Sequence, residues 1–166
     1  MSVYDELGLP SSVLNRRVFA PIEDIVLAIL RPAFPTIPIH AALPDAPSVP
    51  FVLVRRMAGW GDYPEDQRGF YDRARFAVHT YTANPDGDMK GAVLSDAIRN
   101  VLYLAWRNHW SDPDLGTVVK LRMISEPTRK TDWATTTGPV QYADLPSGSW
   151  RYETNYITTI RAAERP

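Results

Sequence analysis

Residues 150–161 alternate between apolar and polar side chains, and this alternation constrains the fold more than any other feature of the sequence. The apolar positions are Trp150, Tyr152, Tyr156 and Ile160, and the polar positions are Arg151, Glu153, Asn155 and Arg161. A period of two is typical of a β-strand with one buried face and one face in water. The chain is therefore expected to form a sheet and to cover one of its faces.

Length and composition predict one globular domain around that sheet. The chain has 166 residues, of which 45% are hydrophobic and 22% charged, so it can bury a core but is short for two domains. Residues 1–20 show no clear period and are expected to form an N-terminal arm of the single domain 1–166. The absence of cysteine excludes disulfides and thiolate metal sites.

Charge and hydropathy limit the partners that the chain can have. A formal net charge of -1 lacks the basic excess of a duplex-DNA-binding protein, so no sequence-specific nucleic-acid binding is predicted. No apolar run is long enough to cross a bilayer, and the opening "MSVYDELGLP" lacks the basic and apolar regions of a secretory signal. We expect a protein that is made in the cytoplasm and does not contact a membrane.

Two segments predict amphipathic helices. In "PIEDIVLAILRPAF" (residues 21–34) apolar side chains recur at helical spacing, with Pro21 suited to the first turn and Pro32 expected to end the helix. The turn signal "NPDGD" precedes a second helix with a broad apolar face. That face comprises Val93, Leu94, Ala97, Ile98, Val101, Leu102, Ala105 and Trp106.

Four or five segments predict strands. "PFVLVRRM" (residues 50–57) and "RARFAVHTYTA" (residues 73–83) are rich in β-branched and aromatic residues and are expected to pair as a hairpin. "TIPIHAAL" is expected at an edge because Pro38 lacks an N–H group. "VVKLRMISEP" and the C-terminal stretch complete the set. Grouped strands and helices predict an α+β fold: a mostly antiparallel sheet of four to five strands, two helices on one face and long inter-strand loops.

Common catalytic motifs are absent from the sequence, which has no phosphate-binding loop, zinc-protease helix or nucleophile elbow. We therefore predict neither an enzyme nor a cofactor. His109, Asp112 and Asp114 in "NHWSDPD" offer ligands for a divalent metal, but Asp and Pro at this spacing are typical of a turn, which we favour. Glu65 and Asp66 could form a carboxylate pair for acid–base chemistry, but neighbours in a predicted loop are better interpreted as solvated.

Arginine side chains gather on the face of the predicted sheet that is opposite the apolar residues. The charged residues of this face are Arg73, Arg75, Arg122, Arg151 and Arg161, with Glu153 among them. Two interpretations stay open: a solvated face that resists aggregation, or a face that binds acidic loops of neighbouring copies. Loop aromatics favour protein contacts, because Trp and Tyr are common interface anchors. The candidate interface comprises Trp60, Asp62, Tyr63, Glu65, Asp66, Arg73, Arg75, Arg122, Trp133, Arg151 and Glu153.

Several segments in this order resemble the tail terminator proteins of long non-contractile-tailed phages, especially those of actinobacterial hosts. The resemblance covers roughly residues 20–162. It rests on the order of the segments and on their local sequence, without an invariant motif. The segments are "VPFVLVRRMAG", "DRARFAVHTYT", "AVLSDAIRNVLYLAW", "SEPTRKTDWATTTGPVQYADLP" and "RYETNYITTIRA".

The resemblance implies an α+β subunit of a hexameric ring at the head-proximal end of the virion tail. Such a ring caps the tail tube, stops its growth, and joins the tail tube protein to a neck or head-completion protein, with DNA free to pass through the lumen. It implies no catalysis and no cofactor. By this resemblance, residues 73–76 and 151–156 are sheet framework, and the loops around Trp60 and Trp133 are contacts between rings or with the tube.

Two alternatives remain on the sequence alone. A head-tail connector or neck protein shares the size, the fold class and the lack of catalytic motifs. A small hydrolase or ligand-binding domain is a more distant alternative that would use a pocket under the long loops. If the charged sheet face makes the ring, we expect Arg151→Glu to impair assembly and to leave the fold intact.

Overall fold

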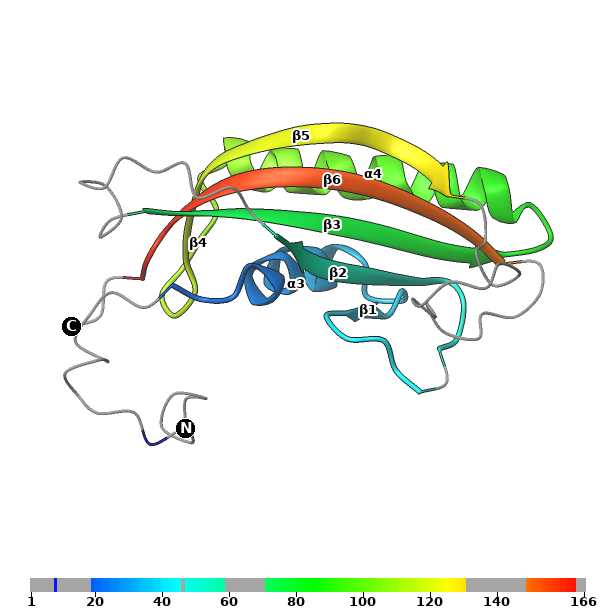
Figure 1. Ribbon diagram of the computed structural model, residues 1–166, viewed down its shortest axis with the longest axis horizontal. Helices are drawn as coiled ribbons and strands as arrows, with labels where there is room; N and C mark the ends of the chain where they lie inside the picture. The colour runs from blue at the N-terminus through cyan, green and yellow to red at the C-terminus, as the bar shows by residue number, and fades with distance from the viewer. Residues whose placement is uncertain (1–7, 9–18, 46, 59–70, 131–148, 164–166) are drawn as a thin grey trace.

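A computed structural model describes residue 8 and residues 19–45, 47–58, 71–130 and 149–163 (Figure 1). These residues form two helices and six strands in one α+β unit. In chain order they are α3 (Ile22–Ala33), β1 (Ile39–His40), β2 (Phe51–Met57), β3 (Tyr71–Ala83), α4 (Gly87–Arg107), β4 (Ser111–Asp112), β5 (Gly116–Lys130) and β6 (Ser149–Arg161). The predicted arm (residues 1–20) and the middles of the two long connections lie almost entirely outside the described residues.

The strands form one curled sheet in the order β1-β2-β3-β6-β5-β4 (Figure 1). The predicted β2–β3 hairpin is confirmed, and β6 inserts between β3 and β5 with antiparallel pairing on both sides. The sheet is mostly antiparallel, as predicted, with β1 and β2 paired in parallel, but the predicted four to five strands need correction because the sheet has six. The added strand β4 has only two residues, too few for an alternating pattern to predict.

Both helices pack on the same face of the sheet, as the sequence predicted. The main core joins α3 and α4 to the inward-facing residues of β2, β3, β5 and β6. At its centre the rings of Phe76 and Tyr156 stack with centroids 5.2 Å apart, and both side chains are fully buried. Full burial of a large apolar side chain contributes about 1.5–3 kcal/mol, so this layer holds most of the hydrophobic stabilisation.

Helix α3 buries the predicted apolar stripe, but its ends differ slightly from the prediction. Pro21 is the N-cap residue, and Pro32 lies inside the last turn, so the helix ends at Ala33. The Phe34 N–H donates to the Leu30 carbonyl at 3.0 Å and completes that turn. A proline so near the end removes one N–H without breaking the preceding turns.

Helix α4 approaches the sheet closely through two glycines. The Thr82 hydroxyl donates to the Gly87 carbonyl at 2.6 Å, and Thr80 shares a 2.7 Å hydrogen bond with Ser95. A side chain at Gly91 would meet the ring of Tyr152 at 2.8 Å. The predicted apolar face is wrong at Val93, which is 64% exposed.

A second apolar cluster lies on the opposite face of the sheet. The rings of Phe51 and Tyr81 stack at 4.4 Å, and with Leu53 they pack against Leu43 and Val49 from the segment between β1 and β2. The sheet is therefore apolar on both faces at this end. The prediction that this face is exposed to water is wrong here. Consecutive residues of β2 and β3 are buried, so these strands do not alternate between buried and exposed residues.

Candidate interaction surface

The predicted charged residues of the strands do lie on one sheet face, opposite the helices. Cross-strand register places Arg75 and Arg122 in one row through Ile157, and Arg73 in the next row with Thr159 and Lys120. Arg151 and Glu153 lie on the same face of β6, where they are paired with Tyr81 and His79 of β3. The other predicted interface residues lie outside the described residues: Trp60, Asp62, Tyr63, Glu65, Asp66 and Trp133.

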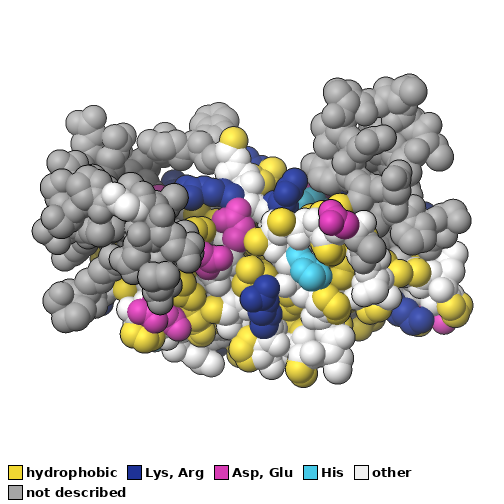
Figure 2. Space-filling model, turned by 90° about the horizontal axis from the view of Figure 1, so that it is seen from below, with side chains coloured by type: hydrophobic (Ala, Val, Ile, Leu, Met, Phe, Trp, Pro, Cys, Tyr) yellow, Lys and Arg dark blue, Asp and Glu magenta, His cyan; other side chains and the backbone are white. Residues whose placement is uncertain are grey.

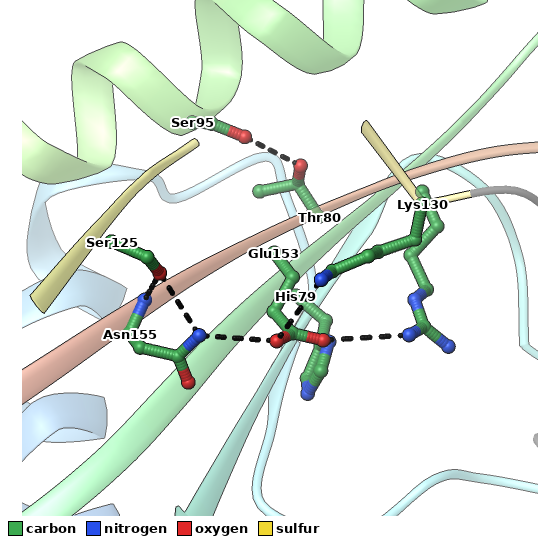
Figure 3. Close-up of polar contacts among 8 residues, drawn as sticks. His79, Thr80, Ser95, Ser125, Lys130, Glu153 and Asn155 are labelled. Atoms are coloured by element: carbon green, nitrogen blue, oxygen red, sulfur yellow. Dashed lines mark hydrogen bonds and ion pairs between the residues drawn. The ribbon is translucent and has the colours of Figure 1, made fainter. Parts of the chain in front are cut away.

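Glu153 is the centre of an enclosed polar cluster on this face (Figure 3). One carboxylate oxygen accepts from the Asn155 amide at 3.1 Å, and the other accepts from the Arg151 guanidinium at 3.4 Å. Lys130 Nζ lies 3.8 Å away, and His79 Nδ1 lies 3.6 Å away. Ser125 extends the cluster, because its Oγ accepts from both the backbone and the side-chain amide of Asn155.

Burial and charge set the protonation of this cluster. Burial, reinforced by the charges of Arg151, Arg55 and Lys130, lowers the pKa of His79 to about 4, and Glu153 offsets only part of that effect. The imidazole is therefore neutral near neutral pH. Burial raises the pKa of Glu153, but the hydrogen bond from Asn155 and the neighbouring His79, Lys130 and Arg151 outweigh it, so this pKa is lowered.

Enclosure changes the role expected of Arg151 and Glu153. Their side chains are only 14% and 16% exposed, so they stabilise the sheet from within rather than presenting charge to a partner. Arg151→Glu would place two carboxylates side by side in a partly buried site, which costs folding free energy. The sequence-based expectation that this variant leaves the fold intact is therefore replaced by an expected loss of stability.

The same face also has a more exposed part, where basic side chains could contact a partner. Arg55, Arg73, Lys120 and Arg122 are exposed, and Arg75 is half-buried between them. None of these five has a carboxylate within ion-pair distance among the described residues, and the buried Nε of Arg75 has no hydrogen-bond partner there. The sequence alternation located Arg73, Arg75 and Arg122. Lys120 was missed, although it lies two residues before Arg122 with no register shift between them and the same alternation could have found it.

The predicted turn at "NHWSDPD" is present, and it uses the carboxylate that a metal would need. Asp112 Oδ1 accepts from the backbone N–H groups of Asp114 and Leu115 at 2.8 and 3.0 Å. His109 adopts a φ of 52° just after α4, and the next residue, Trp110, donates its N–H to the Ala105 carbonyl at 2.8 Å. This arrangement closes the helix end. No group of His, Asp and Glu within the described ranges has the arrangement of a metal site.

Neither described helix combines the length and apolar character needed to cross a membrane. No protein-family model and no curated protein sequence matches the chain. One solved structure, whose name states no function, is 12% identical with a TM-score of 0.41, and the match covers 87% of this chain and 97% of that one. A likeness at this level supports no inference about function.

Proposed function

We propose that this protein is a tail terminator: a virion structural subunit that forms a hexameric ring and caps the head-proximal end of a phage tail tube. The ring stops tube polymerisation and joins the tail to the neck, and the subunit acts by assembly without catalysis or a cofactor. It is made in the host cytoplasm and ends in the virion. The resemblance of the sequence segments and the α+β arrangement of the strands and helices that contain them support this proposal.

The observation that carries the proposal is the group of exposed cations without described acidic partners on one sheet face. Arg73 on β3 is separated by strand β6 from Lys120 and Arg122 on β5. Like charges on one face repel one another weakly, so a solitary subunit gains nothing from their spacing. Arginine binds carboxylates in a bidentate manner and is enriched at protein interfaces. A subunit that assembles with acidic surfaces accounts for this arrangement.

The sequence offers acidic and aromatic residues for other contacts of the ring. Asp62, Glu65 and Asp66 with Trp60 and Tyr63 occur between β2 and β3, and Trp133 occurs between β5 and β6. We propose that these connections contact sister copies, the tail tube protein or the neck protein. Aromatic anchors framed by charge suit such contacts.

Two measurements test this function. Electron micrographs and solution mass of the purified chain should give discrete rings, alone or on addition of purified tail tubes, and the protein should bind tube ends. Binding to the neck protein without binding to tube ends would instead indicate a connector. A strict monomer that ignores tube ends and turns over a small substrate would contradict the proposal and favour the hydrolase alternative.

A further inference from the structure

One border of the sheet combines exposed apolar and basic side chains. Strand β4 pairs only with Gly116 and Thr117, so among the described residues the rest of β5 has no strand on the side away from β6. Along this border Val119 is 40% and Ile124 is 46% exposed. Lys120 and Arg122 are exposed between them. We call Val119, Lys120, Arg122 and Ile124 the β5 edge patch.

The shape of β5 disfavours simple strand addition at this border. Register shifts against β6 fall between Val118 and Lys120, between Met123 and Ser125, and between Ser125 and Thr128. Bulges and a proline such as Pro127 are devices that protect sheet edges from pairing with another strand. Any partner of the β5 edge patch must therefore bind through side chains.

The opposite border of the molecule carries a compact group of acids. Glu23 Oε1 accepts from the backbone N–H of Arg56 at 2.8 Å, and Asp72 lies 3.7 Å from the same arginine's guanidinium. Asp24 is exposed beside Glu23 at the start of α3. We call Glu23, Asp24 and Asp72 the acidic corner. Glu23 and Asp72 contact Arg56, while the charge of Arg31 in α3 acts on Asp24, so the three carboxylates outnumber the two guanidinium groups by one.

The two surfaces lie on opposite sides of the sheet. Strand β5 lies at the upper border in Figure 1, whereas β2 and α3 lie at the lower border. Figure 2 looks at the molecule from below and shows acidic and basic side chains mixed on that side. Because one copy cannot bring its own two borders together, only another molecule can join them.

We propose that the β5 edge patch of one subunit binds the acidic corner of a second copy of this chain, in a head-to-tail interface that repeats around the ring. Carboxylates match the guanidinium and ammonium groups, and Val119 and Ile124 supply the apolar contact. A heterologous interface of this kind closes into a ring when the rotation between copies permits. This inference rests on the proposed function and names the surfaces that the ring would use.

Paired charge reversals test the interface. The patch variant carries Lys120→Glu and Arg122→Glu, and the corner variant carries Asp24→Lys and Asp72→Lys, with Glu23 kept because it binds the backbone of β2. Each variant alone should self-associate at least about tenfold more weakly than wild type. An equimolar mixture should recover rings, because every interface then joins a reversed patch to a reversed corner or a native patch to a native corner.

A control variant separates this interface from attraction by net charge. Lys90→Glu with Arg107→Glu makes the same change in net charge at two exposed positions of α4. It should assemble alone like wild type, because both proposed surfaces are unchanged in it. Thermal melting of all variants checks that each one folds.

Two outcomes would overturn the inference. If either variant alone forms rings as well as wild type, the surface changed in it is not part of the interface, so the proposed pairing fails while the proposed function stands. Loss of rings in the control variant would reduce the effect to net charge, with the same consequence. If wild type forms no ring at any concentration and ignores tube ends, the proposed function fails together with the inference.

Discussion

At the scale of single residues, His79 is the titratable group whose environment has the clearest consequence for stability. Its side chain is 6% exposed and faces Glu153, with Arg151, Arg55 and Lys130 nearby. Its folded-state pKa of about 4 lies below the ordinary histidine value of 6.5. The unfolded chain therefore binds a proton more readily, so the stabilising contribution is complete above pH 6.5 and declines as the pH falls toward 4.

We predict that the free energy of unfolding falls by about 2 kcal/mol between about pH 7.5 and about pH 5 through His79. His79→Gln, which cannot titrate, should remove most of that dependence. Urea unfolding at both pH values measures it. His109→Asn is the matched control, since His109 is exposed and Asn tolerates its positive φ. An unchanged pH dependence in His79→Gln would refute the assignment to this side chain.

At the scale of elements, the contact between α4 and β6 depends on the missing side chains of two glycines. Tyr152 packs over Gly91 while its hydroxyl donates to Asp88 at 2.6 Å, and Trp150 occupies the space beside Gly87. These contacts fix the helix against the sheet from both its backbone and its side chains. The ring of Tyr152 cannot withdraw without losing its hydrogen bond to the helix.

We predict that Gly91→Ala destabilises the protein by about 1–2 kcal/mol, although alanine is the better helix former. The added methyl group would lie 2.8 Å from the Tyr152 ring and 3.1 Å from the Thr82 hydroxyl. Asn100→Ala, at an exposed position of the same helix, should instead stabilise it by about 0.5 kcal/mol. Thermal melting of both variants compares the two effects, and a stabilised Gly91→Ala would show that the helix can move away.

Sequence periodicity predicted the elements whose two faces differ. It located α3, α4 and the long strands, and it placed Arg73, Arg75 and Arg122 on one face. Periodicity failed where both faces of the sheet are covered, as at Phe51 and His79. A continuous apolar run does not show which residues belong to which face. It also could not show that Glu153 is enclosed, since its neighbours on β3 and β5 depend on register across the whole sheet.

At the scale of the whole molecule, a formal net charge of -1 hides an uneven distribution. Lys120 and Arg122 lie at one border of the sheet. Glu23 and Asp72 contact Arg56 at the other border, with Asp24 next to Glu23. Balanced net charge avoids general repulsion between copies, and opposite charges at opposite borders favour one relative orientation. Such a molecule can remain soluble alone and still associate with direction.

Directional association through exposed charges should depend on salt. Surface ion pairs contribute about 0.2–1 kcal/mol each and are screened within about 10 Å at 0.1 M salt. With two or three pairs in each interface, we predict about tenfold weaker self-association when NaCl rises from about 0.05 M to about 0.5 M. Sedimentation velocity measures this change.

Lys120→Gln with Arg122→Gln should associate weakly at both salt concentrations, because its neutral side chains have no charge for salt to screen. Wild-type association that strengthens with salt would instead mean that Val119 and Ile124 dominate the interface, since salt favours apolar burial.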